Sequence, residues 1–181
     1  APKPHPQEAI DDGILSRLHG TIKTVTDELD AYDPTHAARS MENFVVEDLS
    51  KWWIRRSRDR FPESAEFLRY ILIETSKLLA PFIPFTAEHI YKQASNRSES
   101  VHLEDWPKAK NKYLNPELEI AMAKAREIVT LALGLRKHAG IKVRQPLASL
   151  SVRAVVPETL AYLIKDEVNV KEILFAPSQS E

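Results

Sequence analysis

The sequence predicts a mainly α-helical protein, an antiparallel helical bundle followed by a small α/β appendage. Apolar residues recur at three- and four-residue steps through most of the first 139 residues, which is the period of amphipathic helices. The 181 residues include only four glycines, which disfavours a turn-rich all-β fold. After Gly140 the pattern changes to the alternation typical of strands. We therefore expect a helical bundle over residues 1–140 and a small α/β subdomain over residues 141–181.

The first two helices carry clear start signals. The first is expected over residues 7–32, with an apolar stripe at Leu15, Leu18, Ile22, Val25 and Leu29. Gly20 lies inside this helix, where glycine lowers stability, so it indicates a close helix contact. Asp33 and Pro34 read as an N-cap and a proline at the first helical position. The second helix should run from there to about residue 61.

Prolines and a glycine divide the remainder. Pro81 and Pro84 separate a third helix over residues 63–79 from a fourth over residues 85–94. Residues 101–107 alternate and should lie extended across the bundle, with Trp106 packed against it. A fifth helix is expected from Pro116 to about residue 139, where Gly140 ends it as a left-handed cap. Strands are expected over residues 141–144, 149–156 and 170–175, with a short helix over residues 157–167.

Composition excludes several kinds of protein. Hydrophobic residues make up 43% of the chain and charged residues 28%, as in globular proteins. The absence of cysteine excludes disulfides and thiolate metal sites. No apolar run reaches the roughly 18 residues of a membrane span, and no signal peptide opens the chain. We expect a cytoplasmic monomer with no membrane partner. The missing initiator Met and the proline-rich start suggest a piece of a longer protein.

Residues 51–60, here called the basic segment, concentrate the chemistry of the chain. They contain five of the 25 basic residues and two of the three tryptophans, with a single acid. Flat aromatic and guanidinium groups at this density suit unpaired bases and phosphates. With net charge −1, a nucleic-acid role must come from such local charge. The alternative is that the tryptophans belong to the core and the arginines pair with acids.

Helical phase divides the basic segment. On a regular α-helix Trp52 continues the core stripe, and Trp53 is rotated about 100° from it. We therefore expect Trp52 to pack and Trp53 to be free for a surface contact. Arg55 should lie one turn from Asp59 and be partly neutralised by it. Arg58 and Arg60 remain the freer candidates.

Signatures of catalysis are missing from the sequence. It has no phosphate-cradling glycine motif, no cysteine nucleophile and no nucleophile elbow. The six histidines are scattered, and no two stand at metal-ligand spacing on one helix. We expect no catalytic residue, no zinc or other metal site, and no cofactor in this chain.

Four segments together resemble a known family. Trp52-Trp53-Ile54-Arg55-Arg56-Ser57-Arg58 with its flanks is similar to the anticodon-binding domain of class I isoleucyl-tRNA synthetases, although Lys51 departs from the usual Asn. The other segments lie around Pro81-Phe82-Ile83-Pro84-Phe85, around Trp106-Pro107, and at Gly140-Ile141-Lys142-Val143-Arg144-Gln145-Pro146-Leu147. The resemblance covers roughly residues 10–176. The proline segment is shared with valyl, leucyl and methionyl relatives.

The resemblance implies a division of labour. Members of the family activate isoleucine with ATP and Mg and charge tRNA in other domains, whose nucleotide-binding signatures are not found in this sequence. This chain would bind the anticodon arm of isoleucine tRNA and contact the remaining domains of the synthetase. Its expected tRNA-binding residues are Trp53, Arg55, Arg56, Arg58, Arg60, Lys142 and Arg144. The alternative is a structural helical module of a valyl- or leucyl-type class I synthetase, in which the basic segment packs and does not bind RNA.

Overall fold

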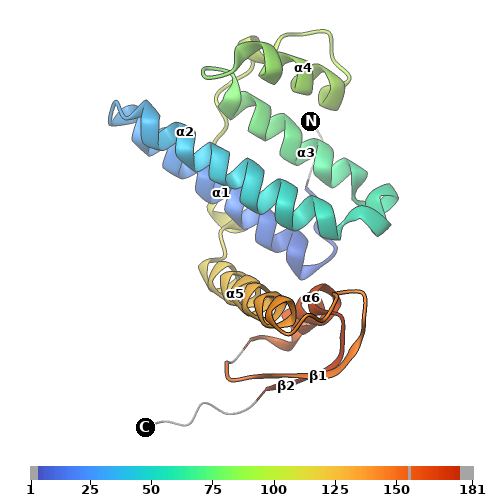
Figure 1. The fold of residues 1–181 in the computed structure, drawn as a ribbon. Coiled ribbons are helices and arrows are strands. Elements are labelled where there is room, and N and C mark those ends of the chain that lie inside the picture. The colour runs from blue at the N-terminus through green and yellow to red at the C-terminus, as the bar shows by residue number, and fades with distance from the viewer. Residues whose placement is uncertain (1–3, 155, 176–181) are drawn as a thin grey trace. The chain divides into compact units, whose positions relative to one another are not determined.

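The computed structural model describes residues 4–154 and 156–175. The chain forms two compact units, which we call unit 1 (Ala1–Asn115) and unit 2 (Pro116–Glu181). Unit 1 is helical, and unit 2 combines helices with a two-stranded sheet (Figure 1). The predicted fold class, a helical bundle with a small α/β appendage, is confirmed. The first residues of the proline-rich start, on which the suggestion of a longer protein partly rests, lie outside the described residues.

Unit 1 begins with two helices joined by a short turn. α1 (Ala9–Asp30) is followed by α2 (Pro34–Asn43), and the two pack against one another. The side chain of Asp33 accepts a 3.0 Å hydrogen bond from the backbone N–H of His36, which confirms it as the N-cap of α2. At the start of α1 the Asp11 carboxylate accepts a bond from the Glu8 N–H in a capping box.

The predicted second helix differs from the regular α-helix that the sequence suggested. α2 continues directly into η1 (Phe44–Ile54), a π-helix, and the chain then bends at Ser57 into the 3₁₀ turn η2 (Arg58–Arg60). α2 and η1 form one continuous rod in Figure 1. A π-helix bonds each residue to the fifth along the chain and has a wider turn than an α-helix. As a result the α-helical phase used for the basic segment does not apply there.

Two more helices and an irregular return complete unit 1. α3 (Phe61–Leu79) and α4 (Pro84–Ser95) are separated by the predicted proline break and pack together. The 3₁₀ turns η3 (Val101–Leu103) and η4 (Asn111–Tyr113) follow, so residues 101–103 are not extended. The remaining return does cross the bundle, because Trp106 donates to the Thr26 hydroxyl at 2.9 Å and the Asn115 N–H donates to Ser16 at 2.8 Å. Trp106 itself is only half-buried.

The core of unit 1 lies along the inner face of α1. It includes the predicted stripe residues Leu15, Leu18, Ile22 and Val25, all of which are buried. A second cluster joins α3 to α4 through Ile73, Ala80, Ala87, Tyr91, Ala94 and Val101. Among the residues that the structure describes, no helix has both the length and the apolar character required to cross a membrane.

Unit 2 pairs two helices with a parallel sheet. α5 (Pro116–His138) packs on α6 (Glu158–Val168). The strands β1 (Leu147–Val152) and β2 (Val170–Phe175) run parallel, with Leu147 opposite Val170. α6 therefore forms the crossover that parallel strands require. Gly140 has φ +69°, which confirms the left-handed end of α5.

The strand predicted at residues 141–144 is not formed. This stretch is a turn, and the Arg136 guanidinium holds it by donating to the carbonyl groups of Lys142, Val143 and Gln145. Arg136 is buried beneath the turn. The alternating pattern of Ile141 and Val143 does not lead to a strand here, because the carbonyl groups of this stretch accept hydrogen bonds from a side chain and not from the backbone of a neighbouring strand.

The boundary between the compact units also differs from the predicted one. The sequence suggested a bundle over residues 1–140, whereas the structure divides between Asn115 and Pro116. Helical period alone assigned α5 to the bundle. The helix instead buries residues such as Met122, Ala125 and Val129 within the unit that contains α6 and the sheet. Tertiary packing, and not secondary-structure type, sets this division.

Candidate nucleic-acid interface

Trp53 is a core residue and not a surface contact. Its side chain is 0% exposed, and its ring lies 5.6 Å from that of Phe67 between centroids. The indole Nε1–H donates a 2.7 Å hydrogen bond to Asp11. The prediction that Trp53 would stack on a base is therefore wrong, because the π-helical turn of η1 brings both Trp52 and Trp53 to the inner side.

Arg60 points into the same cluster. Its guanidinium donates to both carboxylate oxygens of Asp11, at 2.8 and 2.6 Å, and to the Ser57 hydroxyl at 3.1 Å. The side chain is only 17% exposed, so the expectation that Arg60 would be a freer surface residue is wrong. We call Asp11, Trp53, Ser57 and Arg60 the Asp11 cluster. It joins the start of α1 to the end of the basic segment.

Asp11 is held as an anion at the centre of this cluster. Burial raises the pKa of a carboxyl group, but hydrogen bonds from Arg60, the Gln7 backbone N–H and Trp53 outweigh that effect. The pKa of Asp11 therefore lies below its usual value. With one anion and one cation in a buried, hydrogen-bonded pair, the cluster fixes the fold and offers no free charge to a ligand.

Arg56 lies over its own helix. The guanidinium carbon stands 3.3 Å from the centroid of the Trp52 ring, and one nitrogen donates to the Trp52 carbonyl at 2.9 Å. This cation–π arrangement covers the buried indole. Arg56 is half-buried, and its outward edge is all that a ligand would meet.

Arg55 and Arg58 remain at the surface of the basic segment. Both are exposed. Arg58 makes no hydrogen bond or ion pair with any residue in the described part of the chain. It stands in the short turn η2, directly after the bend at Ser57. A guanidinium in this setting keeps all of its donors for a partner.

Lys142 and Arg144 belong to unit 2. Both side chains are exposed in the turn that Arg136 supports. Three carbonyl bonds from one buried guanidinium fix the backbone of this turn, so it presents the two cations from a defined loop. These residues and the basic segment lie in different compact units.

A polar groove that the sequence reasoning missed lies in unit 1. It follows α1 and α2, has a volume of about 350 Å³, and includes Arg17 and Arg39 in its lining. Its signal in the sequence was two polar rows at helical spacing, which run from Arg17 to Thr24 and from His36 to Asn43. We call it the α1–α2 groove.

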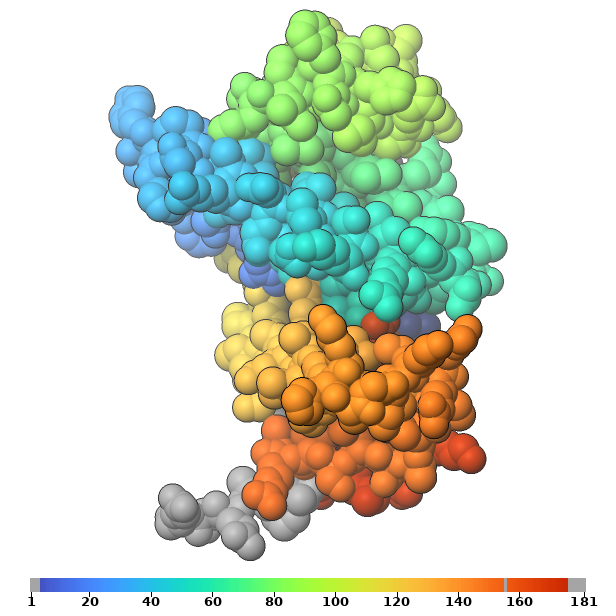
Figure 2. All heavy atoms as spheres, in the orientation of Figure 1, coloured from blue at the N-terminus to red at the C-terminus, as the bar shows by residue number. Residues whose placement is uncertain are grey.

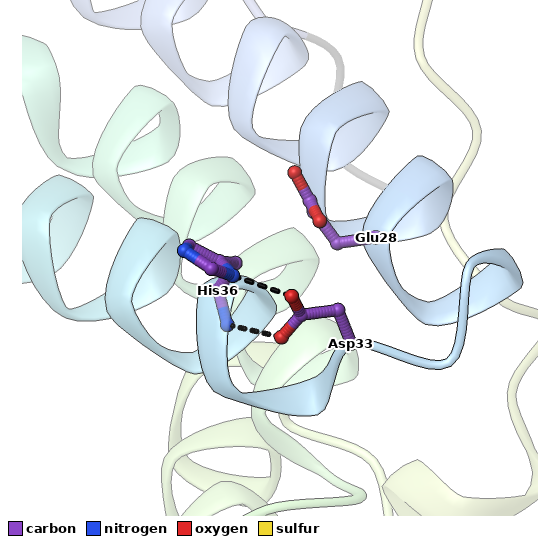
Figure 3. Close-up of side chains that lie close together, drawn as sticks. All are labelled: Glu28, Asp33 and His36. Atoms are coloured by element: carbon purple, nitrogen blue, oxygen red, sulfur yellow. Dashed lines mark hydrogen bonds and ion pairs between the residues drawn. The ribbon is translucent and has the colours of Figure 1, made fainter.

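One set of side chains has ligand atoms close enough together to share a metal ion. In the part of the chain that the structure describes, Glu28, Asp33 and His36 place these atoms within 4.8 Å of one another (Figure 3). Asp33 already has a structural task, since it caps α2 and accepts a 2.5 Å bond from the His36 ring. These bonds, the backbone one first, hold the pKa of Asp33 below its usual value. The geometry is that of a helix cap, and the expected absence of a metal site stays a prediction.

Comparison with known proteins supplies the family. The sequence profile described as "Anticodon-binding domain of tRNA ligase" matches residues 11–153. The chain is 39% identical to an isoleucine–tRNA ligase of Porphyromonas gingivalis over 92% of its length, and 36% identical to one of Deinococcus radiodurans over 100%. An isoleucine–tRNA ligase of Clostridium tetani is 39% identical over 96% of the chain.

The chain matches only a small part of each relative. The aligned part amounts to 16% to 18% of the length of those three relatives. The family profile covers most of unit 1, including the basic segment and the α1–α2 groove, and extends into unit 2 as far as residue 153. The resemblance seen in the sequence is thereby confirmed, and the chain belongs to the family of anticodon-binding domains of tRNA ligases.

Proposed function

We propose that this chain binds the anticodon arm of isoleucine tRNA as one domain of an isoleucine–tRNA ligase. The single observation that carries the proposal is Arg58, an exposed guanidinium without a partner in the described part of the chain, in a family of anticodon-binding domains. Phosphate oxygens match a guanidinium in bidentate fashion. Arg55 supplies a second exposed cation three residues earlier.

The buried residues of the basic segment have a supporting part in this proposal. The Asp11 cluster bonds the end of the segment to α1, and Arg56 covers Trp52, so contacts on both sides of Ser57 support the bend. A bend supported in this way holds Arg58 in place before RNA arrives, which lowers the entropy lost on binding. Lys142 and Arg144 add backbone contacts from unit 2.

Catalysis is assigned to other parts of the protein. We propose that activation of isoleucine with ATP and Mg, and transfer to tRNA, take place in domains outside this chain, which spans less than a fifth of its relatives' length. The chain itself would need no cofactor, and it would work as part of a cytoplasmic monomer. Its own contribution is recognition.

A structural module remains the second candidate function. It is favoured by Arg60, which is bonded to Asp11, and by Arg56, which packs on the Trp52 ring. Under this alternative the basic segment would stabilise the fold or hold a neighbouring domain. Arg58 distinguishes the two functions, because it contributes no described contact to the fold.

The test is titration of a fluorescently labelled anticodon stem-loop of isoleucine tRNA at two salt concentrations. Arg58→Gln should weaken binding roughly three- to tenfold and reduce the slope of log K against log salt by about one. Lys51→Gln is the matched control, since Lys51 is exposed in the same segment but pairs with Glu47 at 2.6 Å. Its effect should stay below about twofold.

Specificity needs a second RNA in the same assay. A stem-loop with the same stem but a different anticodon should bind more weakly than the isoleucine sequence. Equal affinity for both would leave RNA binding in place and remove anticodon recognition. Equal affinity of the parent chain and Arg58→Gln for the isoleucine stem-loop would favour the structural module.

A further inference from the structure

The α1–α2 groove has one arginine on each side, among polar residues of the two helices. α1 contributes Arg17, Thr21 and Thr24, and α2 contributes His36, Arg39 and Ser40. Thr21 and Thr24 follow Arg17 at steps of four and three residues, and Arg39 and Ser40 follow His36 by three and four, so each set lies on one face of its helix. Gly20 adds no side chain to the α1 row. The result is an open channel lined by guanidinium, imidazole and hydroxyl groups.

The two arginines of the groove differ in whether an acid pairs with them. Arg17 is held by the buried Asp48, with a 2.9 Å contact from its Nε. Arg39 is exposed, and no residue in the described ranges 4–154 and 156–175 forms a hydrogen bond or ion pair with its side chain. None of the residues that line the groove is a carboxylate. Arg39 is therefore the cation whose charge is available.

Carboxylates lie near two of the groove's lining residues, and Asp48 is the one paired with Arg17. Asp33 and Glu28 lie beside His36, where the chain turns from α1 into α2 (Figure 3). Arg39 follows His36 by three residues, which is roughly 4.5 Å along the helix axis. Because Asp33 is already bonded to the start of α2 and Asp48 to Arg17, an anion is favoured at Arg39, where Ser40 can also donate a hydrogen bond.

We propose that the α1–α2 groove binds a backbone phosphate of the same RNA, with Arg39 as its main contact. The inference rests on the proposed function and adds a second contact site to it. A groove of about 350 Å³ is large enough for a sugar-phosphate unit. Groups that donate hydrogen bonds to phosphate oxygens position RNA without reading its sequence. The groove thus sets the orientation of the RNA, and the basic segment meets it elsewhere.

The distance between the two sites fits an extended partner. Arg39 and Arg55 are sixteen residues apart on the α2–η1 rod, so the two sites lie several helical turns from one another. The atoms of α2 and η1 are at the surface of unit 1 in Figure 2. A single free phosphate cannot contact both sites, whereas a hairpin of several base pairs can. Losses from the two sites should therefore add.

The experiment uses the 181-residue chain and the isoleucine stem-loop described above. Arg39→Gln should weaken binding roughly three- to tenfold with a salt slope smaller by about one. Combined with Arg58→Gln, the losses should multiply. The control is Lys23→Gln on α1, because Lys23 is exposed, pairs with Asp27 at 2.5 Å and lies outside the groove. Its affinity should change by less than about twofold.

The outcomes separate the groove from the basic segment. If Arg58→Gln weakens binding and Arg39→Gln does not, the groove proposal falls while the proposed function stands. If only Arg39→Gln weakens binding, the groove stands and the role of Arg58 falls. A third arm titrates inorganic phosphate alone against the parent chain and Arg39→Gln. Phosphate binding that is lost in Arg39→Gln while stem-loop affinity stays unchanged would overturn the RNA assignment.

Discussion

The Asp11 cluster and the α1–α2 groove use the same residue type for opposite purposes. In the cluster, Arg60 meets a carboxylate that is nearly inaccessible, and both charges are satisfied. In the groove, Arg39 stands in solvent with no described partner. The difference teaches that the position of a buried acid, and not the number of arginines, decides which cations are available to a ligand. Stability should depend on the first region and affinity on the second.

The largest expected effect comes from Asp11→Ala. Removing the carboxylate leaves Arg60 without its partner in a mostly buried site and takes the acceptor from the Trp53 indole. Breaking a buried ion pair by deleting one partner costs about 3–5 kcal/mol. The free energy of unfolding, measured by urea denaturation, should fall by this amount.

Asp12→Ala is the matched control for Asp11. Asp12 is the next residue on α1, and its side chain is exposed. Partial desolvation by the neighbouring protein, followed by the charge of Asp11, raises its pKa. Its removal should change the free energy of unfolding by less than about 1 kcal/mol. Similar losses for the two variants would mean that the cluster does not have the stabilising role assigned to it.

A second effect should appear with pH, at the buried His19. Its ring is 0% exposed, and its Nδ1 accepts a 3.3 Å hydrogen bond from the Lys110 backbone N–H. Nδ1 must therefore carry no proton, so the ring is neutral. Burial, with the charges of Lys110 and Lys112, lowers the pKa of His19 to about 4. Below the usual value of 6.5 the unfolded chain binds a proton that the folded chain does not.

Stability should therefore be full above pH 6.5 and fall as the pH decreases toward 4. The contribution of His19 approaches about 1.4 kcal/mol per pH unit in this window. Urea denaturation from pH 7 to 4.5 should show a shallower pH dependence for His19→Phe than for the parent chain. Parallel curves would show that His19 titrates normally and that the return segment at residues 104–115 is not held through a neutral ring.

The smallest expected effects on the free energy of unfolding come from substituting two arginines of the basic segment. Arg60→Gln should lower the free energy of unfolding by about 1–3 kcal/mol, because Asp11 loses charge-assisted hydrogen bonds. Arg58→Gln should change it by no more than about 0.5 kcal/mol, since the side chain makes no described contact. Thermal and urea denaturation of both variants checks this contrast. Equal costs would erase the distinction between the packed and the open arginines.

RNA binding should show the reverse order for the same pair. Under conditions where both variants are folded, Arg60→Gln should keep the stem-loop affinity of the parent chain within about twofold, while Arg58→Gln loses affinity. A larger loss for Arg60→Gln than for Arg58→Gln would place the buried cluster at the interface and contradict its geometry.

Local signals predicted much of the secondary structure. The N-cap at Asp33, the proline break before α4, and the left-handed Gly140 each depend on a few neighbouring residues. Four of the five residues of the predicted α1 stripe are buried, and Leu29, near the end of the helix, is half-buried. The family, too, follows from linear motifs, and the comparisons confirm it.

Other features were outside the reach of local patterns. The prediction for Trp53 assumed α-helical phase, but η1 is a π-helix with a wider turn, and Trp53 lies in the core. The stretch expected as a strand at residues 141–144 is a turn, because its carbonyl groups accept hydrogen bonds from the Arg136 side chain. α5 looked like one more bundle helix, although it packs in unit 2.

The sequence by itself determined that this is a helical domain of the tRNA ligase type with a basic segment at residues 51–60. Those features depend on composition and on spacing within one element. Only the tertiary structure decided which cations remain available, because Asp11 lies 49 residues before Arg60 in the chain and yet binds it directly. Ion pairs between residues so far apart in the chain depend on how the helices pack, and the spacing of residues within a single helix does not predict them.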